Sequence, residues 1–209
     1  MKVGNVEIYW LGHASFKIKG GGRVIYIDPW KLKSAEEATL VLVTHEHFDH
    51  CSPEDVAKIV GRKTVIVTTP DCAAKLKGNI RAVTPGDVIE LDGLRVETVA
   101  AYNTDKGFHK MASRWVGFVI TLGGVRIYHA GDTDKIQEMR DLRNITVALL
   151  PVSGTYVMTA EQAAEAAKII KAGISVPMHY GDIVGSEKDA ERFKALCEGM
   201  RVEILNKER

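Results

Sequence analysis

Residues 40–50 read LVLVTHEHFDH, an apolar run that passes directly into three histidines and an aspartate. A short continuous apolar run is typical of a strand that is buried on both faces. Neutral imidazole and carboxylate are the usual protein ligands of zinc and similar divalent ions. In an extended or turning segment His45 and His47 point the same way and can share one metal, whereas Asp49 and His50 follow around a turn and can reach a second. The segment therefore predicts a metal site at the end of a buried strand.

The segments on either side of this cluster also carry clear local patterns. Ser15–Lys19 and Val24–Asp28 are predicted strands joined by a turn at Gly20-Gly21-Gly22. After the cluster, Ser52 is a typical helix N-cap followed by proline, and this helix is expected to end at Gly61. The metal cluster thus lies between a buried strand and a capped helix.

The rest of the chain alternates strands and helices around one irregular segment. Residues 102–114 show no period and are predicted to be a functional loop. A helix over 160–172 follows the N-cap Thr159, with Gln162 at the capping-box position. The other predicted elements are strands at Val6–Trp10, Leu40–Thr44, Val65–Thr68, Val147–Leu150, Ser175–Met178 and Arg201–Leu205, a meander at Arg81–Val83, Val88–Glu90 and Arg95–Ala100, a hairpin at Trp115–Leu122 and Val125–His129, and helices at Asp71–Leu76, at Thr133–Arg140 and from Ser186 to about Glu198.

Several strands followed by helices in each half predict an α/β fold. The expected architecture is a four-layer αββα sandwich, with two sheets face to face and helices on the outer faces. No linker rich in Pro, Gly or Ser interrupts the sequence. Residues 1–209 are therefore expected to form a single domain.

Composition excludes several classes of protein. The chain has 28 Lys plus Arg against 27 Asp plus Glu, so it lacks the basic surplus of a dedicated nucleic-acid-binding protein. No stretch approaches the ~18 apolar residues of a membrane span, and the N-terminus shows no signal-peptide pattern. The three cysteines are far apart and form no disulfide framework. We expect a cytoplasmic protein with a small-molecule substrate and with neither nucleic-acid nor membrane partners.

The segment THEHFDH at 44–50 matches the metal-binding signature of the metallo-β-lactamase superfamily. Further motifs agree with that family in order and spacing: LGHAS at 11–15, IDPW at 27–30, YHAGDTD at 128–134, LLPVSGTYVM at 149–158 and PMHYG at 177–181. Together they resemble the branch that includes ascorbate-6-phosphate lactonase-like and N-acylphosphatidylethanolamine phospholipase D-like proteins. The resemblance covers nearly the whole chain and implies the four-layer fold of that superfamily.

The resemblance also implies a role for individual residues. His45 and His47 would bind a first metal, and Asp49 and His50 a second. Asp132 matches the carboxylate that bridges the two metals, and the two oxygens of a carboxylate can hold cations ~3.5–4 Å apart. The last ligand implied by the resemblance is His179, on the second metal.

One position departs from the family pattern. Many relatives place a third first-metal histidine just after the strand that ends near Ala101, where this chain has Asn103. Three alternatives follow: His109 folds back to complete the site, Asn103 ligates weakly through its amide oxygen, or the first metal is under-coordinated. Zinc sites with three protein ligands favour His109.

Other residues near the motifs are candidates for supporting or substrate-binding roles. Asp28 ends a strand beside the cluster and can accept a hydrogen bond from a ligating histidine, although an aspartate before proline is also a common turn residue. His13 is a candidate to line the site, and Tyr156 to donate its phenol to substrate. In the loop, Lys110, with Lys106 and Arg114, is a candidate to hold a phosphate or carboxylate of the substrate.

These features predict a metal-dependent hydrolase in which metal-activated water attacks a small, anionic lactone or other acyl ester. Asp49 or Asp132 would orient the water and shuttle its proton. One or two divalent ions are expected, with zinc first, manganese second and iron third. A phosphodiesterase is the alternative activity, and a non-hydrolytic diiron redox or metal-responsive protein is the alternative of another class.

Overall fold

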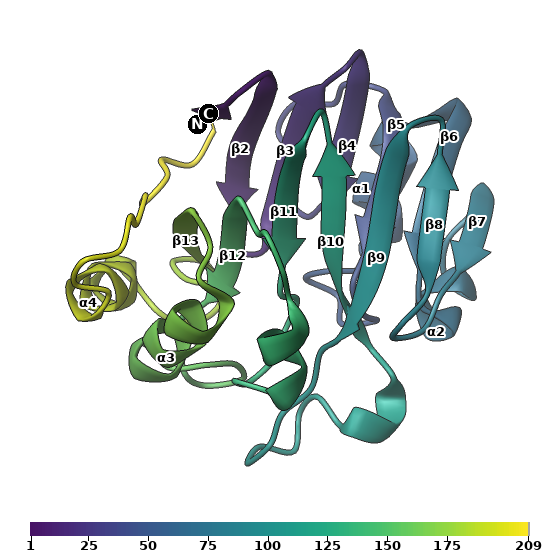
Figure 1. The fold of residues 1–209 in the computed structure, drawn as a ribbon. Coiled ribbons are helices and arrows are strands. Elements are labelled where there is room, and N and C mark those ends of the chain that lie inside the picture. Colours follow the sequence, from purple (N-terminus) through teal and green to yellow (C-terminus); the bar gives the residue numbers. More distant parts are fainter. Residues whose placement is uncertain (209) are drawn as a thin grey trace.

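The computed structural model describes residues 1–208, which form two β-sheets packed face to face (Figure 1). In the first sheet the strands follow one another in chain order, from β1 to β7. The bounds are β1 Lys2–Val3, β2 Val6–Gly12, β3 Ser15–Gly20, β4 Arg23–Ile27, β5 Ala38–Val43, β6 Val60–Thr68 and β7 Asn79–Ala82.

The second sheet has the order β13-β12-β11-β10-β9-β8. In both sheets, antiparallel strands at one end meet parallel strands at the other, and the change comes at β4 in the first sheet and at β11 in the second. The bounds are β8 Val88–Leu91, β9 Leu94–Ala100, β10 Val116–Leu122, β11 Val125–His129, β12 Val147–Pro151 and β13 Ile174–Met178.

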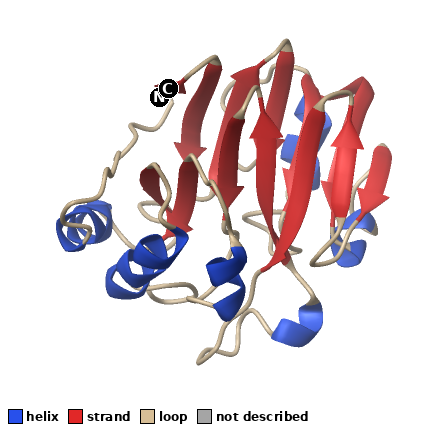
Figure 2. Ribbon diagram, viewed as in Figure 1, coloured by secondary structure: helices blue, strands red, loops and turns tan. Residues whose placement is uncertain are grey.

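Helices lie outside the two sheets, which confirms the predicted α/β sandwich (Figure 2). Helices α1 and α2 lie behind the first sheet, and α3 and α4 pack on β12 and β13. Among the described residues no helix is both long and apolar enough to cross a bilayer. The bounds are α1 Pro53–Ile59, α2 Pro70–Ala73, α3 Ala160–Ile170 and α4 Glu187–Leu196, with 3-10 turns η1 Met111–Ser113 and η2 Gln137–Asp141.

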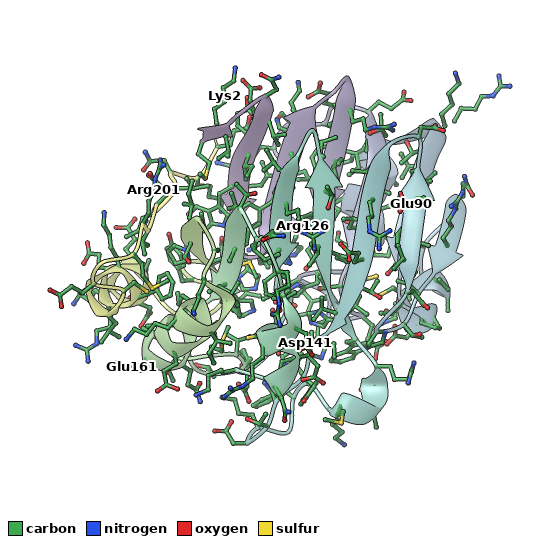
Figure 3. The ribbon with its side chains drawn as sticks, viewed as in Figure 1. Lys2, Glu90, Arg126, Asp141, Glu161 and Arg201 are labelled. Carbon is green, nitrogen blue, oxygen red and sulfur yellow. The ribbon has the colours of Figure 1, made fainter. Side chains whose placement is uncertain are left out.

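Local sequence signals account for the helix ends. The Ser52 side chain accepts a hydrogen bond from the Asp55 amide, and Thr159 and Gln162 form the expected capping box of α3. The apolar faces pack into the space between the sheets, while charged side chains such as Lys2, Glu90 and Arg201 lie at the periphery (Figure 3).

Three predicted elements were wrong. Residues 79–82 pair with β6 in the first sheet rather than opening a meander, because α2 returns the chain parallel to β6. The helix predicted from Thr133 is only the short turn η2, because the Thr133 side chain bonds the backbone of Tyr102 instead. Residues 201–205 make a single bridge to Ser175 and then leave β13 to reach β2.

The topology brings the carboxyl ends of nine strands to one edge of the sandwich. Strands β2, β4, β5, β6 and β7 run in the same direction in the first sheet, and β9, β11, β12 and β13 do so in the second. The segments that follow them carry the sequence motifs, including the loop 101–115 at the lower edge of Figure 1. Ligand sites in sheets with parallel strands form at the carboxyl ends of the strands.

Asp55 of α1 fixes one of these segments. Its carboxylate accepts hydrogen bonds from the backbone amides of Lys31 and Leu32, and Lys58 pairs with it. Burial raises the pKa of Asp55, but the contacts with Lys58, Ser52 and these amides outweigh burial and lower it. The ionised carboxylate therefore holds the turn that follows Asp28 against the helix.

We predict that Asp55→Asn lowers the free energy of unfolding by about 1–3 kcal/mol at pH 7, because hydrogen bonds to a charged acceptor are lost. A lowered folded-state pKa gives stability that is present above the unfolded value, about 3.9, and lost as pH falls through the folded value. The difference between wild type and variant in urea unfolding should therefore shrink below about pH 4. Glu54→Gln, an exposed neighbour in the same turn, is the control. A difference that is independent of pH would contradict the assignment.

Candidate metal centre

Three histidines form the first group of candidate ligands. His45 leaves the end of β5, with its Nδ1 2.9 Å from the Thr44 hydroxyl. Its Nε2 lies 3.1 Å from Nδ1 of His47. His109 comes from the loop 101–115, and the nitrogens of all three rings lie within 4.8 Å of one another. The structure thus places His109 where the sequence expected a third ligand.

Asn103 holds His109 in place. The His109 backbone N–H donates to the Asn103 side-chain oxygen at 2.9 Å, and the Asn103 backbone N–H donates to the His109 carbonyl at 2.7 Å. The Asn103 amide group donates in turn to the Tyr156 carbonyl at 2.9 Å. Because both ends of the Asn103 side chain are engaged, the structure favours the alternative in which His109, and not Asn103, faces the metal.

The second group combines His13, Asp49, His50 and His179, whose ligand atoms also lie within 4.8 Å of one another. His13 Nε2 is 2.9 Å from an Asp49 oxygen, and the His13 and His179 rings are 3.9 Å apart. Ser153, whose hydroxyl lies 3.1 Å from His179 Nδ1, orients that ring. His13 therefore lines the site, in contact with two expected ligands.

Asp132 stands between the two groups. One of its oxygens lies 3.0 Å from His179 Nε2 and 3.3 Å from His109 Nε2, and the other lies 3.4 Å from His50 Nε2. The side chain is almost completely buried. This position fits the bridging role that the sequence resemblance implied for Asp132.

Asp28 supports the centre from below. It is fully buried, and one of its oxygens lies 2.7 Å from His50 Nδ1 and accepts a hydrogen bond from the Thr44 hydroxyl. The other oxygen accepts from the Thr44 backbone N–H. A carboxylate on the far nitrogen of a ligating histidine fixes its tautomer and ring orientation. These contacts fit the supporting role expected of Asp28.

The free ends of these side chains fit a cation. The buried atoms His50 Nε2, His109 Nε2, His179 Nε2 and one Asp132 oxygen have no hydrogen-bond partner of acceptable geometry, although they face one another. Orphaned buried polar atoms are costly, and several at one point call for an ion that satisfies them together. The donor set of imidazoles and carboxylates suits zinc, manganese or iron.

The electrostatics of the centre favour the same conclusion. Burial raises the pKa of Asp132, but His179 and His50 outweigh burial and hold it well below its usual range. Burial also raises the pKa of Asp49, and the His13 hydrogen bond brings it to about 2. For His45, burial lowers the pKa well below its usual value. At neutral pH the carboxylates are therefore ionised and His45 is neutral, which are the forms that bind metals.

Burial lowers the pKa of His50, yet the neighbouring Asp132 and Asp28 carboxylates raise it well above its usual value. The same negative charge that retains a proton on this ring attracts a metal ion in its place.

A pocket of about 310 Å³ opens above the centre, and Tyr156 is one of its lining residues. Donation of the Tyr156 phenol to a substrate stays a prediction. The predicted cationic side chains do not take part. Lys106 pairs with Asp134 and Asp105, and Lys110 and Arg114 are exposed and absent from the lining. None of the three cationic side chains of the loop therefore lines the pocket. The lining residues are His47, Phe48, Asp49, Phe108, His109, Asp132, Tyr156, His179 and Ile183.

Trp115 is a site residue that the sequence analysis missed. Its ring centroid lies 4.9 Å from those of His45 and His47, and its N–H donates to Asp71 at 2.6 Å. It closes the inner side of the first group. Its place at the start of a hairpin, directly after the irregular loop, was the only signal in the sequence.

The comparisons with known proteins agree with this geometry. The family model described as "Beta-lactamase superfamily domain" matches residues 7–179. The chain belongs to the β-lactamase superfamily. Within it, the chain is 37% identical to a UPF0173 metal-dependent hydrolase of Thermoplasma acidophilum, over 92% of this chain and 91% of that protein. It is also 37% identical to a UPF0173 metal-dependent hydrolase of Methanoculleus marisnigri, over 96% of this chain and 94% of that protein.

A solved structure shows the same fold. A Parabacteroides distasonis protein assigned to the metal-dependent hydrolases superposes with a TM-score of 0.85 at 32% identity, covering 96% of this chain and 94% of that one. The chain is thus a metal-dependent hydrolase of the β-lactamase superfamily. The narrower lactonase-like and phospholipase D-like branch stays a prediction.

We predict that Asp28→Asn weakens metal binding about 10–100-fold, because an amide cannot accept from the His50 N–H as the carboxylate does. Titration of the metal-free variant with zinc, followed by calorimetry, measures the effect. Asp141→Asn, an exposed change on η2, is the control. Unchanged zinc affinity in a folded Asp28 variant, judged by circular dichroism, would refute the supporting role.

Proposed function

We propose that this protein hydrolyses small acyl esters or lactones with water activated by two divalent ions, of which zinc is the first choice. The observation that carries the proposal is the position of Asp132, buried between two groups of candidate ligands beneath a single pocket. Two cations held by one carboxylate can act on the same substrate bond.

Each of the two ligand groups would hold one ion. His45, His47 and His109 would hold one ion, and Asp49, His50 and His179 the other, with Asp132 shared. A bound divalent ion supplies two things: it lowers the pKa of water toward ~7 and it polarises a carbonyl oxygen. In the reaction, the water oxygen joins the carbonyl carbon, the acyl C–O bond breaks, and the alcohol leaves with a proton.

Asp49 is better placed than Asp132 to handle that proton. The Asp49 side chain lines the pocket and is partly exposed, whereas Asp132 is almost completely buried. His13, at 2.9 Å, fixes one Asp49 oxygen, so the other oxygen is the one available to the second ion and to the water that the ion would hold. The lowered pKa of Asp49 keeps its carboxylate ionised at neutral pH, so that it can accept a hydrogen bond from water and orient it.

The shape and charge of the pocket favour acyl bonds over phosphodiesters. Among the described residues, the lining contains no lysine or arginine to neutralise a phosphate. A phosphodiesterase remains the alternative, because the same water can attack phosphorus. A non-hydrolytic redox role is disfavoured, since the relatives above are metal-dependent hydrolases.

We predict that wild type binds two zinc or manganese ions per chain and His109→Ala only one, because the first group loses one of its three rings. Elemental mass spectrometry on protein purified in excess metal checks this. His129→Ala serves as a control histidine outside both groups, since His129 bonds the Ala14 carbonyl in the core. Two ions retained by His109→Ala would remove His109 from the ligand set.

We predict that His47→Ala reduces ester hydrolysis by the metal-loaded protein to the uncatalysed rate while the circular dichroism spectrum stays that of wild type. His47 is half-buried and contributes to one ligand group, so its loss leaves the core packing intact. Glu46→Gln, which removes a surface pair with Lys75 next to His47, should retain activity. Full turnover in His47→Ala would end the assignment.

A further inference from the structure

We infer that the substrate is a neutral ester or lactone whose acyl part carries a small apolar group, and that Phe48, Phe108 and Ile183 bind that group. The inference rests on the proposed acyl hydrolysis and specifies its substrate class. It departs from the anionic substrate expected from the sequence. The three side chains lie in the pocket directly above the candidate metal centre.

Exposed apolar side chains concentrate at this pocket. Among the described residues, only five large hydrophobic side chains are exposed. Phe48, Phe108 and Ile183, at 69%, 52% and 41%, line the pocket, and Met111, at 61%, follows on the loop of Phe108. Only Val88 lies elsewhere, on the far strand β8. Contiguous exposed apolar surface beside polar catalytic groups marks a ligand-binding site.

Two of these side chains are held in position although they face solvent. The Phe108 ring packs edge-on against Tyr156, with centroids 4.7 Å apart at 83°. The Phe48 ring packs edge-on against Trp30, at 6.2 Å and 73°. Edge-to-face pairs of this kind are favourable beyond simple burial. These contacts restrict the side-chain conformations of both phenylalanines. An apolar group that binds against them therefore costs little further side-chain entropy.

The charges around the pocket disfavour an anionic substrate tail. Inside the lining, the only ionisable side chains are the carboxylates Asp49 and Asp132 and the candidate metal ligands His47, His109 and His179. Three nearby cations are engaged elsewhere: Lys106 with Asp134, Lys75 with Glu46, and Lys31 over the Trp30 ring at 4.0 Å. Lys110 is exposed and does not line the pocket. A carboxylate or phosphate tail would lose its hydration without gaining a partner.

The size of the pocket limits the apolar group. A volume of about 310 Å³ is at the low end for small-molecule sites. A larger hollow of about 630 Å³ lies on the outer face of the second sheet, where Arg126 and Glu97 pair within it (Figure 3 labels Arg126 there). It contains none of the candidate metal ligands, so we assign no chemistry to it. The reacting group and the apolar group must share the smaller pocket.

Isosteric substrates test the inference. The zinc-loaded protein is assayed with p-nitrophenyl 4-methylpentanoate and with mono-p-nitrophenyl succinate, which differ by two methyl groups in place of two carboxylate oxygens. After subtraction of the uncatalysed rates, we expect kcat/KM to be at least about tenfold higher for the neutral ester, the ratio that a fitted apolar pocket supplies. Equal values, or a preference for the succinate, would overturn the inference.

Substitutions locate the effect. Phe108→Ala should raise KM for the neutral ester about tenfold with little change for the succinate, and Phe108→Leu should restore most of the loss. Val88→Ala, an equally exposed apolar residue far from the pocket, should leave both substrates unchanged. Metal content is measured for each variant, so that loss of an ion is not mistaken for loss of the apolar contact. A Phe108→Ala enzyme with unchanged preference contradicts the proposal.

A binding measurement separates this inference from the proposed activity. Calorimetry compares 4-methylpentanohydroxamate with succinic monohydroxamate, which share a metal-chelating head and differ in the same tail. Suppose that neither ester is hydrolysed, but that the neutral hydroxamate binds about tenfold tighter and Phe108→Ala removes the difference. The apolar binding site would then be supported, and the proposed acyl hydrolysis would be refuted. If the succinate derivative binds as tightly, the apolar pocket falls whatever the activity.

Discussion

A single buried carboxylate, Asp132, is the point at which candidate ligands from both sheets meet. The first sheet contributes His45 and His50, the second contributes His109 and His179, and all four rings face the two oxygens of Asp132. Such a concentration of imidazoles around one acid is stable only when the remaining lone pairs are satisfied. The fold therefore gathers side chains from both sheets into a cluster that can hold a cation.

Three residues around the centre have strained backbone conformations. His13, Asp28 and His179 have φ of 50°, 45° and 61°, in the left-handed region that favours glycine. A residue held there costs on the order of 1 kcal/mol or more. Two of these residues are joined directly, since the His179 N–H donates to the His13 carbonyl, whereas Asp28 bonds the candidate ligand His50. Strained backbone conformations at the carboxyl ends of these three strands, β2, β4 and β13, are typical of binding sites.

The sequence predicted the features that depend on local pattern. The apolar run before His45, the cap at Ser52 and the capping box at Thr159 and Gln162 each involve residues within a few positions of one another, and each appears as expected. The position of β7 did not follow from such patterns, because parallel pairing is decided by the crossover through α2. The strand predicted at 201–205 does not form for a similar reason, because the C-terminal segment leaves β13 and makes a bridge to the distant β2.

Some features of the candidate site could likewise be predicted from local sequence, and others could not. The cluster at 45–50 was evident because its ligands are adjacent, whereas the third ligand of the first group was open to three alternatives until the fold brought His109 against Asn103. The apolar walls were invisible for a different reason: a lone Phe48 or Phe108 in a polar segment has no period to detect, and its meaning comes from a neighbour on another segment.

The carboxylates Asp49 and Asp132 lie at the bottom of the pocket, beneath apolar side chains, and this arrangement affects the strength of charge interactions there. When an apolar group fills the space between Phe48, Phe108 and Ile183, it displaces water from above Asp49 and Asp132. Charge interactions strengthen as water leaves, because the effective dielectric constant falls. Binding of the uncharged part of the substrate would thus increase the stabilisation that cations held by these carboxylates and the neighbouring histidines would give to the developing oxyanion. Truncating the apolar tail should therefore lower kcat as well as raise KM, which ties recognition of the tail to the chemistry at the carbonyl.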